Sequence, residues 1–134
     1  MQQRSLTKDK FPGKWDLAVA GHISFGEDAM SAAIQETMEE IGYVLPRKLT
    51  TQNFRYLTCF RSQIKVSENY IENQFYDFFV LNKHISQGSL ILQKSEVLGA
   101  KYVSIPELLS MRDKGLLHPR TEWIEVLIRH IKKS

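Results

Sequence analysis

Three glutamates, Glu36, Glu39 and Glu40, stand close together in a stretch whose other residues favour a helix. Residues three and four positions apart share a face of an α-helix, so we expect these carboxylates to lie side by side. Their like charges repel one another, and a hard divalent cation such as Mg²⁺, which takes oxygen ligands, offsets that repulsion. Taken alone, such a triplet more often forms a solvated acidic face. Its spacing relative to two glycines favours a metal site instead.

The glutamates belong to a longer pattern that begins at Gly21. Five residues separate Gly21 from Glu27, and seven more lead to the run Gln35-Glu36-Thr37-Met38-Glu39-Glu40-Ile41-Gly42-Tyr43. This segment resembles the signature of the Nudix family, G-x5-E-x7-R-E-U-x-E-E-x-G-U, in which U is an aliphatic residue. Every glycine and glutamate of the signature is present in register. Gln35 replaces the arginine, and Thr37 and Tyr43 occupy aliphatic positions. We call residues 21–43 the Nudix box.

The resemblance implies roles for these residues. Glu36, Glu39 and Glu40 would bind the metal, joined by the backbone carbonyl of Gly21. Glu39 would also orient or deprotonate the attacking water. The metal, Mg²⁺ or alternatively Mn²⁺, would neutralise the charge of a diphosphate and lower the pKa of bound water.

The remaining positions of the Nudix box have supporting roles. Glu27 would support the loop and the start of the helix, where negative charge is favoured. Gln35 can hydrogen-bond a carboxylate but carries no charge, so reduced activity is one expectation. Some Nudix enzymes use a glutamate outside the box as the base, and here Glu72 and Glu96 are the residues that could serve.

Further stretches are similar to the type I isopentenyl-diphosphate isomerases, a branch of the Nudix superfamily. They are Gln2-Gln3-Arg4-Ser5, Lys8, Phe11-Pro12-Gly13, Gly21-His22, Phe54-Arg55-Tyr56 and Glu72-Asn73. Those enzymes move protons with a cysteine just before Gly-His and with a glutamate two residues after the position of Glu72. Here these positions hold Ala20 and Gln74, and neither side chain can exchange a proton in that role. We therefore expect a hydrolase and not an isomerase.

The isomerase resemblance also implies how a diphosphate would be bound. Residues matching Arg4 and Lys8 contact the diphosphate there, and a guanidinium suits phosphate geometry. His22 lies beside the metal site in this interpretation, although a structural hydrogen bond is an equal alternative. The small-molecule substrate stays open between nucleoside diphosphate derivatives and isoprenoid or other organic diphosphates. A catalytically weak, ligand-binding or regulatory Nudix domain is the alternative function.

Hydrophobic patterns and turn residues predict the elements that position these groups. A helix spans 28–41 and stops at Gly42, and its buried side is expected to carry Met30, Ile34, Thr37, Met38 and Ile41. Another begins at the N-cap Ser104 and ends near Gly115. A third, amphipathic helix covers 121–133, with Trp123, Ile124, Leu127, Ile128 and Ile131 on one face. Strands are expected at 17–23, 54–64, 70–81 and 100–103, with turns at 11–14 and 65–69. The mixture indicates an α/β or α+β class, and the resemblance implies a Nudix α/β/α sandwich around a mixed sheet.

Length and composition set the remaining bounds. The 134 residues, 43% hydrophobic and 25% charged, fit a single globular domain, 1–134. The net charge of +3 is spread along the chain, so nucleic-acid binding is not expected. No apolar run reaches the length of a membrane span. The single cysteine, Cys59, expected to be buried in a strand, fits a reducing compartment, with the cytoplasm as the default.

The first residues match the interior of a strand in the expected fold. Either the native chain starts earlier, or the sheet lacks an N-terminal strand that a partner subunit supplies. An unpaired strand edge favours pairing with another chain. A homodimer through such an edge is therefore a hypothesis.

Overall fold

The structure is a computed structural model that describes residues 1–42 and 50–133. The last position of the Nudix box, Tyr43, lies outside the described residues. The elements are β1 (Gln2–Arg4), β2 (Trp15–Asp16), α1 (Ala29–Glu40), β3 (Phe54–Ser67), β4 (Tyr70–Leu81), β5 (Val97–Ala100), α2 (Ile105–Asp113) and α3 (Glu122–Lys133). Short 3-10 turns cover Thr51–Asn53 and Gln87–Ser89.

The strands form two small sheets. β1 lies between β2 and β5 and pairs with both in the antiparallel sense, and β3 and β4 form an antiparallel hairpin. One parallel bridge, between Trp15 and Leu117, makes the pairing mixed. The predicted α+β class with mixed strand directions is confirmed.

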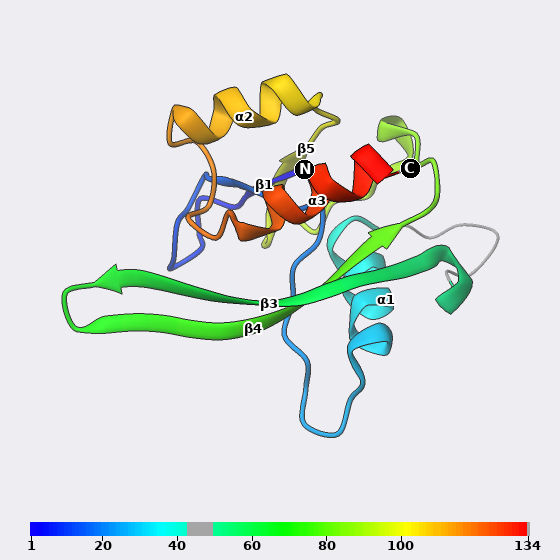
Figure 1. Ribbon diagram of the computed structural model, residues 1–134, viewed down its shortest axis with the longest axis horizontal. Coiled ribbons are helices and arrows are strands. Elements are labelled where there is room, and N and C mark those ends of the chain that lie inside the picture. Colours follow the sequence, from blue (N-terminus) through cyan, green and yellow to red (C-terminus); the bar gives the residue numbers. More distant parts are fainter. Residues whose placement is uncertain (43–49, 134) are drawn as a thin grey trace.

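Helices cover both sides of the strands, and each side has its own apolar cluster. Figure 1 shows α2 and α3 on one side of the β3–β4 hairpin and α1 on the other. The larger cluster joins α2 and α3 to β4 through Leu108, Met111, Leu117, Trp123, Ile124 and Phe78. The smaller one packs Ile41, at the end of α1, against Ile85. This arrangement has the three layers expected from the sequence.

The β3–β4 hairpin is the longest feature of the fold and extends beyond the body of the molecule (Figure 1). β4 has the predicted bounds. β3 continues three residues past the predicted end at Ile64, so only Glu68 and Asn69 form the turn. Ile71 and Phe75, on the outer part of β4, are 54% and 76% exposed. Among the described residues β4 pairs with no strand other than β3.

Two predicted strands are placed differently in the structure. Residues 17–23 are not a strand, because strand pairing stops at Asp16 and the backbone amide of Ala20 instead donates to the Glu40 carboxylate (3.2 Å). The strand expected at 100–103 is β5, which ends at Ala100. The pairing with the first residues continues only as far as Lys101, through reciprocal bonds to Met1 of 2.8 and 2.9 Å.

Three side chains predicted to be buried are exposed. Cys59 points to the outer face of the hairpin opposite Asp77, so the prediction of a buried cysteine is wrong. Met38 is 39% exposed because α1 buries Ala32, Thr37 and Glu40 instead. In α3, Trp123 and Ile124 are buried as predicted, whereas Ile131 near the helix end is 50% exposed. No described helix is long and apolar enough to cross a membrane.

Candidate active site

Both ends of α1 are fixed by local chemistry. The Asp28 carboxylate caps the N-terminus by accepting from the amides of Met30 (3.1 Å) and Ser31 (3.0 Å). At the other end Gly42 has φ +55°, in the left-handed region that favours glycine. A Cβ on Gly42 would also lie 2.1 Å from the backbone oxygen of Ile91. The predicted helix and its stop at Gly42 are thus confirmed, and α1 holds its glutamates in a fixed register.

Glu40 is the buried carboxylate of α1, with 6% of its surface exposed. Its Oε2 accepts from the side-chain amide of Gln2 (3.0 Å) and from the backbone amide of Ala20 (3.2 Å). The pKa of Glu40 is raised to about 7, mainly by burial. The two hydrogen bonds act to lower it, and the charges of Glu36 and Glu96 add to the rise. Glu40 therefore links α1 to β1 and to the segment before Gly21.

Glu36 lies directly against the backbone of Gly21. A Cβ built on Gly21 would be 2.0 Å from the Glu36 Cδ and 2.1 Å from its Oε1. Partial burial is the main cause that raises the pKa of Glu36, and the negative charge of Glu39 is the next. Glu96 and Glu27 add to the rise, and the charge of His22 opposes it. The contact explains why the pattern needs a glycine at position 21.

Glu39 is exposed and its Oε1 accepts from the side-chain amide of Gln35 at 2.8 Å. Gln35 therefore holds a box glutamate by a neutral hydrogen bond, in the position where the family signature has arginine. Within residues 1–42 and 50–133, no three His, Cys, Asp or Glu side chains converge closely enough to hold a metal ion in this arrangement. The charge of Glu39 raises the pKa of Glu36, and the charge of Glu36 raises that of Glu40, while Glu39 and Glu40 accept hydrogen bonds from different donors.

The loop before α1 is closed by Glu27, whose Oε2 accepts from the amide of Ser24 (3.2 Å). A backbone bond from the Glu27 amide to the Ser24 oxygen (3.0 Å) completes the turn. His22 is exposed on the same loop and lines the cleft described below.

The basic residues and glutamates outside the box fall into two groups. The Lys8 ammonium pairs with the carboxylate of Glu96. The negative charge of Glu96 contributes to the raised pKa values of Glu36 and Glu40. Arg4 donates to the backbone oxygen of Lys10 (2.9 and 3.2 Å) and lies 4.0 Å from the Asp16 carboxylate.

Glu72, like Arg4, bonds to residues outside the Nudix box. Its carboxylate pairs with the Lys10 ammonium (2.8 Å) and accepts from the Tyr76 hydroxyl (3.2 Å). The hydrogen bond from Lys10 is the main cause that lowers the pKa of Glu72. Among these predicted site residues, Glu96 and its partner Lys8 are therefore linked to the box carboxylates, whereas the bonds of Arg4 and Glu72 described above join residues outside the box.

Two residues with a part in this site were missed from the sequence. Gln2 anchors Glu40, a contact between positions 38 apart in the chain that no local pattern signals. Asp28 caps α1, and its place just before the helix was a recognisable signal.

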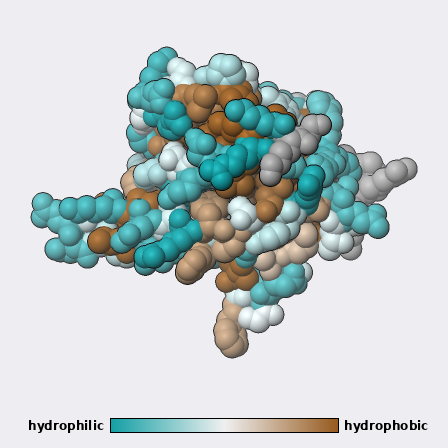
Figure 2. Space-filling view, in the orientation of Figure 1, coloured by the Kyte–Doolittle hydropathy of each residue, from teal (hydrophilic) through white to brown (hydrophobic). Residues whose placement is uncertain are grey.

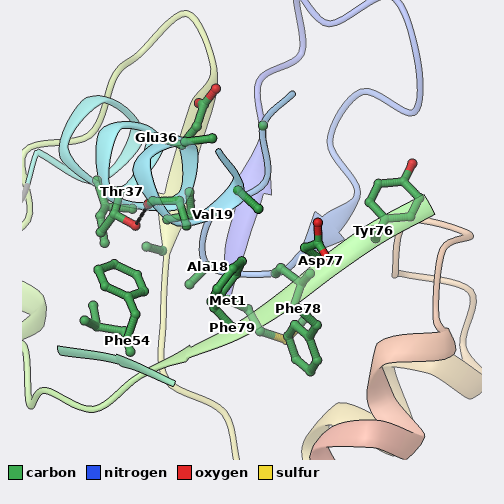
Figure 3. Close-up of a pocket in the computed structure, with 18 of the residues that line it drawn as sticks. Met1, Ala18, Val19, Glu36, Thr37, Phe54, Tyr76, Asp77, Phe78 and Phe79 are labelled. Atoms are coloured by element: carbon green, nitrogen blue, oxygen red, sulfur yellow. Dashed lines mark hydrogen bonds between the residues drawn. The ribbon is translucent and has the colours of Figure 1, made fainter. Parts of the chain in front are cut away.

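A cleft of about 670 Å³ opens beside the box, between α1, the segment around Val19 and β4. In Figure 3 the Glu36 carboxylate points away from the cleft interior, where Phe54 and Phe79 lie. Figure 2 shows apolar residues gathered in the middle of this face of the molecule, between the hairpin and α1. The arrangement places the box carboxylates at one end of a mostly apolar cleft.

Helices on both sides of the strands, with clustered glutamates on a capped helix, define an α+β domain with an acidic centre. A family model for the NUDIX domain matches residues 1–127, and the chain belongs to the Nudix family.

Two curated relatives and one solved structure illustrate the similarity. Nudix hydrolase 3 of Arabidopsis thaliana is 35% identical over 117 residues, which make up 85% of this chain and 15% of that protein. An uncharacterized Nudix hydrolase of Listeria monocytogenes is 31% identical over 119 residues, 89% of this chain and 63% of that protein. The chain thus spans less than two thirds of either relative. The crystal structure of DR0079 from Deinococcus radiodurans shares the fold, with a TM-score of 0.65 and 21% identity, covering 96% of this chain and 71% of that one.

Proposed function

We propose that the protein hydrolyses a diphosphate linkage in a small molecule, using Mg²⁺ or Mn²⁺. The observation that carries the proposal is the contact of Glu36 with Gly21, beside a second carboxylate, Glu40, whose pKa is raised to about 7. Carboxylates crowded in this way favour a cation, because a bound cation relieves both their repulsion and the cost of burying them. Members of the Nudix family generally use divalent cations, which agrees with this reading.

Hard oxygen donors fit such a cation. Glu36 and Glu40 would hold it, with the backbone oxygen of Gly21 close to Glu36. Glu39 would become a further ligand after giving up its hydrogen bond from Gln35. Its side chain is exposed and can therefore change its orientation. A bound divalent cation would polarise the phosphorus centre and acidify a coordinated water.

The protein groups would then divide the remaining tasks. Glu39, exposed on α1, is proposed to orient and deprotonate the attacking water. Lys8 is proposed to contact the diphosphate, since its partner Glu96 stands near the box carboxylates. His22 is proposed to contact the same group from the loop. Arg4 would need to leave the Lys10 carbonyl to take part.

Metal-dependent turnover tests this proposal. Release of phosphate or phosphomonoester from a panel of diphosphates is measured with and without Mg²⁺, for the wild type and for Glu39→Gln. We expect metal-dependent turnover that falls about a hundredfold or more in the variant. Glu125→Gln, at an exposed position on α3, is the matched control and retains activity. Equal turnover in all three proteins would refute the role of Glu39.

A second function is a ligand-binding Nudix domain with weak catalysis. The observation that favours it is Gln35, which holds Glu39 without a charge. Calorimetry that detects tight diphosphate binding by folded protein, together with no turnover across the panel, would support this function over the hydrolase.

Isomerase chemistry is not proposed. Ala20 contributes only its backbone amide, to Glu40, and the Gln74 side chain accepts a hydrogen bond from Tyr76 (2.7 Å). Neither position offers a group that can donate and recover a proton.

A further inference from the structure

The cleft beside α1 has mostly apolar walls and a charged end at the Nudix box. Most of its lining is apolar and comes from three parts of the chain: α1, the segment before Gly21, and β4 with its surroundings. Representative wall residues are Val19, Ala29, Ala33, Phe54, Phe79 and Leu81. A volume of about 670 Å³ lies within the range of sites that enclose small organic molecules.

Several polar side chains along these walls bond to the protein itself. The bonds are Thr37 Oγ1 to the Ala33 oxygen (2.6 Å), Tyr102 Oη to the Ile85 oxygen (2.5 Å), Gln87 Nε2 to the Ala100 oxygen (2.9 Å), Tyr76 Oη to Gln74 Oε1 (2.7 Å) and Arg61 Nε to Asn73 Oδ1 (2.7 Å). Lys101 Nζ is similarly paired with Glu107 (2.7 Å). A nucleobase is recognised by donors and acceptors that turn toward its edges, and these bonds turn part of the polar capacity of the walls toward the protein instead.

The charged end of the cleft is the Nudix box. Gly21, His22 and Glu36 line the cleft there, and the Glu36 carboxylate points away from the apolar interior (Figure 3). A diphosphate bound at the box would therefore direct the group that it carries along the apolar walls between α1 and β4.

We propose that this cleft binds a hydrocarbon group, so that the substrate is the diphosphate ester of an apolar alcohol rather than a nucleoside diphosphate derivative. The inference rests on the proposed hydrolase function, because it assigns the substrate class of the same site. Contact with apolar walls stabilises the bound chain by an amount that grows with its buried length. The box contributes the same binding to every diphosphate, and the cleft discriminates among them.

Two measurements on the full chain test the substrate class. Turnover is compared for a series of straight-chain alkyl diphosphates of increasing length and for nucleoside diphosphates and their sugar esters. Binding of the corresponding alkyl monophosphates is measured by calorimetry, which requires no catalysis. We expect the affinity to rise roughly fourfold per added methylene until the cleft is filled, the factor that corresponds to about 0.8 kcal/mol per buried CH₂.

Filling the cleft provides the matched variant. Ala33 lines the cleft from α1, and Ala33→Leu should raise KM for the longest alkyl diphosphates roughly tenfold while leaving the shortest unchanged. Ile131→Phe adds bulk at an exposed position of α3, outside both the box and the cleft lining, and should leave both unchanged. If Ala33→Leu lowers the melting temperature too far for assay, Ala29→Leu on the same wall replaces it.

The outcomes separate this inference from the hydrolase proposal. Turnover of nucleoside diphosphate derivatives in preference to alkyl diphosphates would overturn the substrate class and leave the hydrolase intact. Alkyl phosphate binding that grows with chain length, without turnover of any diphosphate, would support the cleft and overturn the hydrolase. Binding that is independent of chain length would overturn the inference.

Discussion

Replacing Gly21 with alanine should impair catalysis without unfolding the protein. The new Cβ would lie 2.0 Å from the Glu36 Cδ, and ordinary contact begins at 3.4 Å, so the carboxylate must move by about 1.4 Å. The atoms that must move are the end of a flexible, half-buried side chain. Gly21 does not have the positive φ of the left-handed region, so alanine can adopt its backbone conformation.

The size of the effect follows from that displacement. A misplacement of about 1 Å in a catalytic group can cost on the order of a hundredfold in rate, and Glu36 is the proposed metal ligand. We therefore expect Gly21→Ala to lower kcat at least tenfold and to raise the Mg²⁺ concentration needed for half-maximal activity. The melting temperature should change by only a few degrees, because the carboxylate can turn toward solvent.

The assay is steady-state turnover over a Mg²⁺ titration, accompanied by thermal unfolding. Gly88→Ala is the control, since its Cβ would meet nothing closer than 4.0 Å and its φ is not positive. A folded Gly21→Ala protein with wild-type kcat and wild-type metal dependence would refute the argument that this contact positions Glu36.

Three further predictions concern stability and assembly. Burial lowers the pKa of His118 to about 4, below its unfolded value of 6.5, so the stability is complete above pH 6.5 and falls toward pH 4. Urea unfolding should show a loss of about 2 kcal/mol near pH 5 that His118→Gln reduces, and an unchanged pH profile in that variant would contradict this. Gly42→Ala should cost about 2 kcal/mol or more in the same assay, and Gly115→Ala, also at positive φ but with open space, should cost less. If the edge of β4 pairs two chains, light scattering should give a dimer, and a monomer at assay concentrations would count against the homodimer.

The helix of the Nudix box could be predicted from the sequence almost to the residue. Its determinants are local: an aspartate cap, a periodic apolar side and a glycine with positive φ at the end. The same holds for the hairpin, where β-branched and aromatic residues flank a short polar turn. Such elements are predicted well because neighbouring residues decide them.

The strand wrongly predicted at 17–23 shows where prediction from local sequence patterns fails. Its apolar residues suit a buried strand, but the amide of Ala20 bonds to Glu40, twenty positions away. The contact of Gln2 with Glu40 joins residues still farther apart. Long-range contacts of this kind decide which carboxylate is buried, so the sequence placed Glu36, Glu39 and Glu40 on one helix but did not predict their different surroundings.

The bond from Ala20 to Glu40 has a consequence for how freely position 20 can vary. The chain provides its backbone amide there, and every amino acid except proline carries that group. Side chains at position 20 can therefore change in evolution or in a designed library without removing the hydrogen bond that holds Glu40. A cysteine or another reactive group could be introduced beside the carboxylates in this way, which makes position 20 a point from which new chemistry could be added to the same scaffold.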